Sequence, residues 1–260
     1  MAAQDKSLIE IFEIISNDGR SVDIVRGVVS FEYHENVLSP MLTAKAIISN
    51  TGSSIVDKDG DMTSIYNGLP LNGGEKVNIK IPSTGAGPDL EFTEKNGNPL
   101  FVSSCSNIIV DAEREQFVIN LISREAITNE TQRVGKKFLS SQKISDSVKK
   151  IIKESLLSDK VVDVDETQNP YGFYGNMKKP FYLLTWLASK SVPAKVGGKR
   201  ATAGYFFFET KEGYHFRSVD SLVDSEPYEV EYTYSPGIVD NQDPYKDFKV
   251  LDFFATRNQN

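Results

Sequence analysis

Few residues in this chain are of a type that could carry catalysis. His34 and His215 are the only histidines, and neither belongs to an HExxH or similar metal-binding motif. Cys105 is the single cysteine, so one chain cannot form an internal disulfide or a cysteine-based metal centre. Neither histidine nor a cationic residue lies near Cys105 in sequence, which favours a small buried residue over a nucleophile. GxSxG, P-loop and GxGxxG motifs are also missing, so we expect no enzyme activity, no catalytic residues and no cofactor.

Alternating carboxylates at Asp57, Asp59 and Asp61 could offer oxygen ligands to calcium. An EF-hand loop needs glycine at its sixth position and glutamate at its twelfth, whereas Gly60 is fourth and Gly68 is twelfth here. The spacing therefore favours an acidic turn, and it leaves open whether an ion binds there.

Two aromatic clusters could stack on sugars, one at 171–174 and one at 205–208. Adjacent aromatic residues point to both faces of a strand, so the second cluster is predicted to be the buried centre of a sheet. A carbohydrate-binding or adhesin domain stays open as an alternative function, and a tail-associated cell-wall hydrolase as a second one.

Composition and charge indicate a globular protein that does not act mainly on nucleic acid. The 260 residues include 29 Lys and Arg against 36 Asp and Glu, for a net charge of −7. The N-terminal segment lacks a basic region followed by a long apolar run, and no stretch approaches the roughly 20 apolar residues of a membrane helix. We expect no signal peptide and no membrane anchoring.

The charge is unevenly distributed along the sequence. Residues 133–153 contain seven basic residues and one acid, whereas residues 220–252 contain nine acids and two lysines. Two solvated faces would explain this pattern, and so would complementary surfaces on stacked subunits.

From Leu8 to Arg124, short alternating segments indicate strands. Apolar residues alternate in LTAKAII (42–48), VNIKI (77–81) and FVINLIS (117–123). The NGNP sequence at 96–99 predicts a hairpin between the extended runs on either side. Roughly seven strands in this length predict a small β-barrel or a sandwich.

After Glu125 the apolar period changes to that of a helix. ISDSVKKIIKESLL (144–157) predicts an amphipathic helix with Ser145 as its N-cap, and Pro180 opens a second helix that ends before Pro193. A hairpin is predicted around Lys211–Gly213, followed by one more strand and a terminal helix from Asp243. One side of that helix would carry Tyr245, Phe248, Leu251 and Phe254.

The predicted class is therefore α+β, mainly β. The expected domains are an N-terminal small β-barrel at 1–124, a helical domain at 125–202, and at 203–260 the start of a second β domain, a partial barrel or sheet with a C-terminal helix.

Most of the chain resembles the central baseplate hub proteins of contractile-tailed bacteriophages, a resemblance that rests on the order and spacing of five segments. These segments are SFEYHENVLSPMLTAKAIISNTGSSI, NGLPLNGGEKVNIKI, FVINLISREAITNETQRVGKKF, YGNMKKPFYLLTWLASKSV and AGYFFFETKEGYHFRSVDSLV. None of them is a catalytic signature.

The resemblance implies a structural virion protein. The hub of that family is a homotrimeric ring whose subunits each carry two similar tube-type barrels, and its channel connects the sixfold tail tube to the threefold cell-puncturing spike. The implied partners are other copies of the chain, the spike protein, a tail tube or tube-initiator protein and other baseplate proteins. DNA would pass through the channel without specific binding. The implied location is the baseplate of the virion tail, assembled in the host cytoplasm.

We expect a subunit or partner interface that involves five residues in or beside the first two matching segments. The predicted interface residues are Asn36, Leu38, Ser39, Tyr66 and Gly73. The sequence departs from the family at its C-terminal end, where too few strands remain for a second complete barrel. We therefore expect either a shortened chain or a C-terminal part that is supplied differently.

Overall fold

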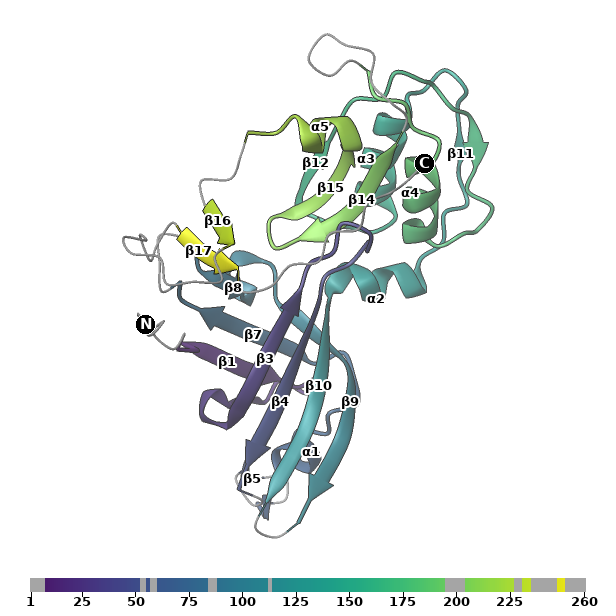
Figure 1. Cartoon of the computed structure of the whole chain (residues 1–260). Coiled ribbons are helices and arrows are strands. Elements are labelled where there is room, and N and C mark those ends of the chain that lie inside the picture. The colour runs from purple at the N-terminus through teal and green to yellow at the C-terminus, as the bar shows by residue number, and fades with distance from the viewer. Residues whose placement is uncertain are drawn as a thin grey trace.

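A curled β-sheet carries a second unit of helices and short strands at one end (Figure 1). The computed structural model describes residues 8–51, 55–56, 60–83, 88–111, 114–194, 204–226, 231–234 and 247–250. Among these residues, no helix is long and apolar enough to cross a membrane.

The sheet has the strand order β2-β1-β7-β9-β10-β4-β3, and β8 also pairs with β7. Its strands are β1 (Ile11–Ile15), β2 (Ser21–Asp23), β3 (Val28–His34), β4 (Thr43–Asn50), β7 (Lys76–Ile81), β8 (Leu90–Phe92), β9 (Leu100–Val110) and β10 (Glu115–Ser123). All neighbouring pairs are antiparallel. In the described part of the chain, the end strands β2 and β3 do not pair, so the sheet is curled and open rather than a closed barrel.

Short elements connect these strands. They are the 3-10 helices η1 (Val25–Gly27) and η2 (Glu94–Asn96), the strands β5 (Ile55–Val56) and β6 (Met62–Thr63), and the helix α1 (Ile65–Gly68).

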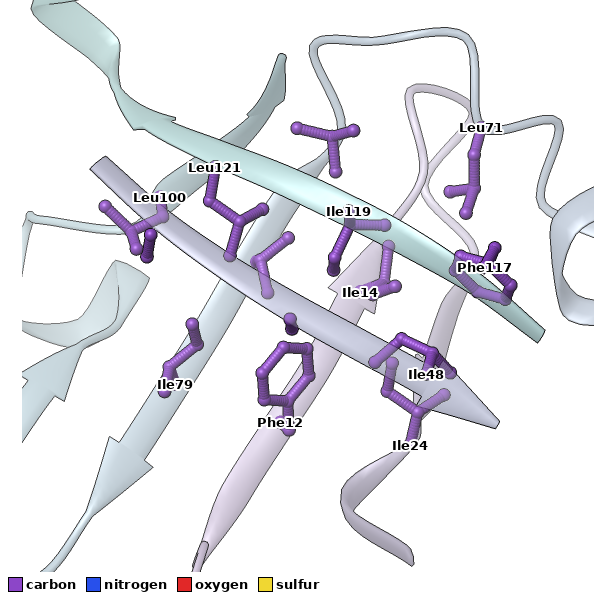
Figure 2. Close-up of a cluster of buried hydrophobic side chains, with 14 of the residues drawn as sticks. Phe12, Ile14, Ile24, Ile48, Leu71, Ile79, Leu100, Phe117, Ile119 and Leu121 are labelled. Carbon is purple, nitrogen blue, oxygen red and sulfur yellow. The ribbon is translucent and has the colours of Figure 1, made fainter. Parts of the chain in front are cut away.

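Alternating apolar residues form the core on the concave side of the sheet (Figure 2). Leu42, Ala44, Ala46 and Ile48 are all buried, as the period-two pattern predicts. Phe12 and Ile14 of β1 and the alternate residues of β7 and β10 belong to the same cluster. The predicted strands at 42–48, 77–81 and 117–123 are therefore confirmed.

The predicted hairpin at 96–99 is wrong. β8 and β9 do not pair with each other; both lie along the same edge of β7, opposite Ile79–Ile81 and Lys76–Val77. Between them η2 is closed by a capping box of Thr93 and Asn96, and Gly97 follows with a φ of +75°. This turn returns the chain to its former direction, so NGNP interrupts one line of strand instead of reversing it.

The second unit follows β10 directly. Its elements are α2 (Arg124–Thr131), β11 (Lys137–Phe138), α3 (Ile144–Glu154), β12 (Val161–Val164), β13 (Phe173–Tyr174), α4 (Pro180–Ala188), β14 (Tyr205–Thr210), β15 (Gly213–Ser218) and α5 (Val219–Val223). The two predicted helices and the hairpin at 211–213 are confirmed. Ser145 is not the N-cap of α3, however. The helix begins at Ile144, so Lys143 is its N-cap and Ser145 lies in its first turn.

One aromatic core joins the middle of the chain to the strands that follow residue 203. Phe181 of α4 lies 6.0 Å from Phe207 of β14, and β12 pairs in parallel with β15. α3, α4, β14 and β15 contribute to the same buried cluster. The division into domains at 124 and 202 stays a prediction.

The predicted C-terminal helix is wrong where it falls on described residues. Asp247–Val250 forms a strand, β17, that pairs in parallel with β16 (Glu231–Tyr234). The spacing of Tyr245, Phe248 and Leu251 suits a helix, but DFKV also alternates as a strand does, and a partner strand decides between the two. The remainder of the predicted helix lies outside the described residues.

Candidate subunit interface

β9 has two strand neighbours at its beginning and only one along the rest of its length. It pairs with β10 from Leu100 to Val110, but with β7 only at Leu100 and Phe101. Two backbone hydrogen bonds extend this contact by one residue, because Gly74 N donates to Val102 O (2.7 Å) and Val102 N donates to Glu75 O (2.9 Å). Beyond Val102, no described strand lies on that side of β9.

We call Ser103–Val110 the free edge of β9. Its backbone hydrogen-bonding groups on the outer side have no strand partner in the described part of the chain, which is the condition under which another strand can be added. Register shifts interrupt the pairing with β10 at Ser103 and at Asn107–Ile108, and Asn107 has a φ of +51°. Such bulges limit indiscriminate pairing, so a strand added to this edge would need a matching shape.

The free edge ends in exposed apolar side chains. Ile108, Ile109 and Val110 are consecutive and all exposed, with Ile109 at 52%. Val110 lies opposite Glu115 at the start of β10, and Asn50 at the end of β4 lies on the other side of Glu115. The apolar side chains therefore lie at the end of the sheet that is farther from α2 (Figure 1).

A second free edge lies on β3, which is one of the two end strands of the sheet. In the described residues β3 pairs only with β4, from Val28 opposite Ile48 to His34 opposite Thr43. Val29 is 65% exposed at the beginning of β3, and Glu32 and His34 are exposed at its end. Each free edge is thus apolar at the end distant from α2 and polar toward the end near α2.

Two buried carboxylates fix loops near the free edge of β9. Glu75 accepts hydrogen bonds from the backbone N–H groups of Asn72 (2.8 Å) and Gly73 (3.0 Å). Glu115 accepts from those of Ile65 (2.9 Å) and Tyr66 (2.7 Å) at the start of α1. Both glutamates are fully buried. A buried carboxylate must have its hydrogen bonds satisfied, so each one holds its loop firmly on the sheet.

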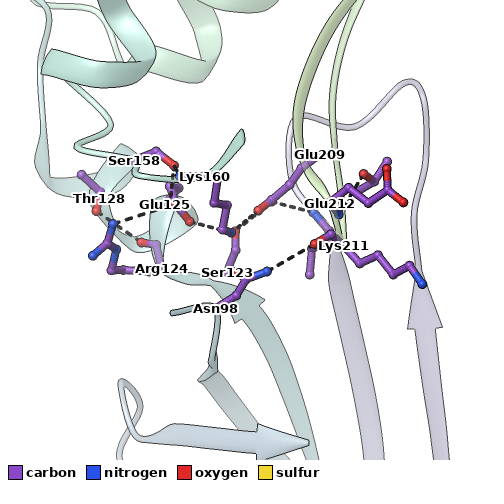
Figure 3. Close-up of polar contacts among 12 residues, drawn as sticks. Asn98, Ser123, Arg124, Glu125, Thr128, Ser158, Lys160, Glu209, Lys211 and Glu212 are labelled. Carbon is purple, nitrogen blue, oxygen red and sulfur yellow. Dashed lines mark hydrogen bonds and ion pairs between the residues drawn. The ribbon is translucent and has the colours of Figure 1, made fainter. Parts of the chain in front are cut away.

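A third group of buried charges joins the sheet to the second unit (Figure 3). Lys160 Nζ lies 2.8 Å from Glu125 Oε2 and 2.5 Å from Glu209 Oε1. Glu209 Oε2 accepts from Ser123 Oγ of β10 (2.8 Å) and from the backbone N–H of Leu42 (3.1 Å). Both glutamates are buried and Lys160 is nearly so. We call Glu125, Lys160 and Glu209 the junction triad.

The two carboxylates of the triad have opposite pKa shifts. Burial raises the pKa of Glu209, and Lys160 offsets only part of that effect. Burial also acts on Glu125, but its ion pair with Lys160 and the hydrogen bond from Ser158 Oγ (2.7 Å) leave its pKa below the ordinary value. Relative to an ordinary glutamate, the ionised form is therefore favoured at Glu125 and disfavoured at Glu209.

The five predicted interface residues lie in three separate places. Asn36, Leu38 and Ser39 lie in the loop between β3 and β4, where Leu38 is 72% exposed. Tyr66 lies in α1 and packs its ring 6.1 Å from that of Phe117. Gly73, with a φ of +105°, lies against the backbone oxygens of Val102 and Ser103, where the free edge of β9 begins. Their role as an interface stays a prediction.

The residues with catalytic side-chain types have structural surroundings. His215 stacks on Phe208 with ring centroids 4.9 Å apart, and its Nε2 lies 2.9 Å from Thr210 Oγ1. His34 is exposed beside Glu32. Cys105 is half-buried against the core, and burial, with a smaller effect of Glu75, raises the pKa of its thiol to about 11. A thiol with this pKa is a poor nucleophile at neutral pH.

The acidic turn lies largely outside the described residues, and several rings of the aromatic clusters pack in the core of the second unit. Asp57 and Asp59 lie outside the described residues, and within the described ones no group of three potential ligands could hold a metal ion. In the second aromatic cluster, Tyr205 and Phe207 are buried in the core. Tyr171 packs against Trp186, with ring centroids 5.6 Å apart.

Sequence reasoning missed the free edges and all four buried glutamates. Glutamate is normally exposed, so nothing in the local pattern marks Glu75, Glu115, Glu125 or Glu209 as buried. The one available signal is NGGEK at 72–76, where two glycines before a glutamate suit a tight turn capped by a carboxylate.

The structure shares its fold with solved tail proteins. No protein family and no curated protein matches the sequence. Among solved structures, the chain is similar to the 43 kDa tail protein of prophage MuSo2 from Shewanella oneidensis, with 10% identity and a TM-score of 0.55, over 86% of this chain and 57% of that one. It is also similar to a tail protein from Neisseria meningitidis MC58, with 12% identity and a TM-score of 0.51, over 86% of this chain and 54% of that one.

These identities show a shared fold. The chain spans just over half the length of both tail proteins. The predicted class, mainly β, is confirmed, and the fold has a curled sheet. The resemblance to central hub proteins stays a prediction.

Proposed function

We propose that this chain is a structural subunit of a bacteriophage-type tail, and that it forms the homotrimeric central hub of a baseplate. In this role it joins the sixfold tail tube to the threefold spike around a channel and acts by shape, without catalysis. The fold shared with two tail proteins supports the class of protein. The pair of free edges on β9 and β3 supports assembly with further copies.

The strand directions make the two edges compatible. β3 is antiparallel to β4, β4 to β10, and β10 to β9, so β3 and β9 run in opposite directions within one copy. If copies are related by rotation about an axis along the strands, β3 of the next copy runs antiparallel to β9 of the first. A contact between two different edges of identical copies closes a ring when the rotation angle divides a full turn.

The side chains match in the same arrangement. The start of β3 and the end of β9 lie at the same end of the sheet, so Val29 of one copy meets Ile109 and Val110 of the next. Toward α2, Ser104 and Ser106 meet Glu32 and His34. Pairing of this kind satisfies the outer backbone groups of both edges and covers exposed apolar side chains, each a favourable contribution to assembly.

The remaining partners follow from the same proposal. The tail tube or its initiator would bind one face of the ring, and the spike the other, with further baseplate proteins around the rim. The location would be the virion tail, assembled in the host cytoplasm. Asn36, Leu38, Ser39, Tyr66 and Gly73 remain the proposed contact residues, and Gly73 has the best support because it adjoins the free edge of β9.

Light scattering of the purified chain tests this proposal. A trimer has three times the chain mass of 28.9 kDa, about 87 kDa. We expect this mass for the chain alone and a larger one after mixing with the spike protein of the same tail. A monomer at every concentration, with and without the spike protein, would contradict the proposal.

A further inference from the structure

A rigid turn in the second unit holds a methionine out into solvent. Asn176 and Met177 both have left-handed backbone, with φ of +48° and +56°. The turn is fixed by backbone hydrogen bonds to the segment before β11, from Met177 N to Val134 O (3.0 Å) and from Gly175 N to Lys136 O (2.9 Å). Two consecutive residues other than glycine in this conformation carry a conformational cost, and such cost is concentrated at functional places.

Two lysine–tyrosine pairs lie on either side of this methionine. Lys137 Nζ lies 5.4 Å from the ring centre of Tyr174, its cross-strand neighbour, and Lys178 Nζ lies 5.4 Å from that of Tyr182. Tyr174, Met177 and Tyr182 are exposed by 60%, 65% and 55%. We call these five residues the basic tyrosine patch.

The patch has an excess of positive charge. Its neighbours Lys136 and Lys179 form ion pairs with Glu154 and Glu130. Lys137 and Lys178 have no carboxylate within ion-pair distance among the described side chains; each instead lies over a tyrosine ring. Both ammonium groups are thus held in place by cation–π contacts and remain available to an anionic partner.

The residue types are those of a protein interface. Tyrosine and methionine are enriched at protein interfaces. Tyrosine buries a large area while losing little conformational freedom, and the flexible side chain of methionine adapts to the partner. In this patch they are exposed, and the hydrogen-bonded turn holds them in place before binding. A pre-formed surface loses less entropy when a partner binds.

The chain itself contains a segment of complementary chemistry. Residues 224–234 read DSEPYEVEYTY, with four acids, three tyrosines and no basic residue. Part of it is β16, which lies on the opposite side of the second unit from β11 (Figure 1). The patch of a copy is therefore distant from β16 of that copy, and a contact between them joins two copies.

We propose that the basic tyrosine patch binds the acidic, tyrosine-rich segment 224–234 of a second copy of this chain. The lysines pair with the glutamates, and the exposed rings and Met177 cover the tyrosines. The contact is separate from the free edges of β9 and β3, and it does not depend on the hub assignment.

A labelled peptide of residues 222–235 is the probe. The peptide is titrated with the full-length chain at concentrations where light scattering finds no self-association, and binding is followed by fluorescence anisotropy. We expect saturable binding that weakens as salt rises from 50 to 300 mM, because exposed charges are screened. K137E/K178E is expected to weaken binding at least tenfold, since it replaces attraction by repulsion at two points.

Control variants and a lipid-vesicle control make the test specific. K149E/K150E changes the same charge on the exposed side of α3, outside the patch, and is expected to leave binding within twofold. Y182S, which keeps the charge, is expected to weaken binding severalfold. Equal loss in both charge variants would show unspecific attraction and overturn the proposal. So would no binding, or binding of the chain to vesicles with 30% phosphatidylserine while the peptide does not bind.

Discussion

The junction triad and the free edge of β9 both carry polar groups that need partners. The triad has its partners within the chain, whereas the outer groups of the free edge have none there among the described residues. At the junction, Glu209 has a lysine, a hydroxyl and a backbone N–H within the chain as partners. At the free edge, the outer backbone groups from Ser103 onward have no strand partner among the described residues. Groups that must keep the two units together are satisfied internally, whereas groups on the edge are left for a partner. We therefore expect the triad to determine stability, and we propose that the free edge determines assembly.

Removal of the lysine of the triad should have the largest effect on stability. Lys160→Met leaves Glu125 and Glu209 buried without their common cation, and breaking a buried pair in this way costs about 3–5 kcal/mol. We expect that loss in the free energy of unfolding measured by urea denaturation. Lys149→Met, an exposed lysine of α3, is the control and should change stability by less than about 0.5 kcal/mol. Equal stability of K160M and the parent would mean that the triad does not hold the units together.

Charge placed on the free edge should abolish assembly and leave folding intact. Ile109→Lys with Val110→Lys introduces two exposed charges where pairing would bury them, a device that natural edge strands use against pairing. We expect the mass from light scattering to fall from trimer to monomer, with stability within about 0.5 kcal/mol of the parent. Val223→Lys, which is 82% exposed in α5, is the matched control and should remain trimeric.

Acid titration distinguishes the two glutamates of the triad, because their contributions to stability change in opposite directions as pH falls. In the folded state the pKa of Glu209 is above its ordinary value of 4.5. Its contribution to the free energy of unfolding therefore becomes more favourable as pH falls through that raised pKa toward 4.5. The folded pKa of Glu125 is below 4.5, so its contribution is present above 4.5 and is lost as pH falls through the lowered pKa.

Glu209→Gln should remove the first contribution only. The stability of the parent relative to E209Q is then expected to rise as pH is lowered from neutral toward 4.5, as measured by urea denaturation at each pH. A constant difference down to pH 4.5 would contradict the raised pKa of Glu209.

The smallest expected effect concerns the thiol near the free edge. The pKa of Cys105 is about 11, two units above the ordinary 9.0, so its thiolate fraction at pH 8 is about a hundredfold lower. Alkylation by iodoacetamide should be slower by about that factor in the folded chain than in urea, with a midpoint near pH 11. A midpoint near 9 would place Cys105 in solvent.

The local sequence pattern predicted the strands and helices that bury one face in the core. It failed where the structure of a segment depends on pairing with a strand that is distant in sequence. Alternation at Leu42–Ile48 and the stripe of α3 identify buried faces, because each residue's environment repeats with the period of its element. The strand at Asp247–Val250 depends on β16, and the line of β8 and β9 depends on β7. Neither partner is visible in a local window.

The candidate interface was predicted less well than the fold for the same physical reason. A strand has a free edge when no other strand pairs with that side, and its own sequence does not show this. The sequence of Ser103–Val110 therefore resembles that of any exposed strand. Leu38 and Asn36 lie in an exposed loop, as their polar and turn-forming neighbours suggest, but exposure alone does not identify a partner. Gly73 adjoins the edge because its positive φ lets the turn pass close to β9.

Hydrogen exchange of the β9 amides tests the central claim most directly. Exchange is compared between the assembled chain and the chain diluted to monomer, with β10 as the internal reference because its backbone is paired on both sides within one copy. If β3 of a second copy completes the sheet, outward-facing amides of Ser103–Val110 become protected on assembly while those of Phe117–Leu121 are protected in both states. Equal exchange of Ser103–Val110 in the two states would show that assembly does not use this edge.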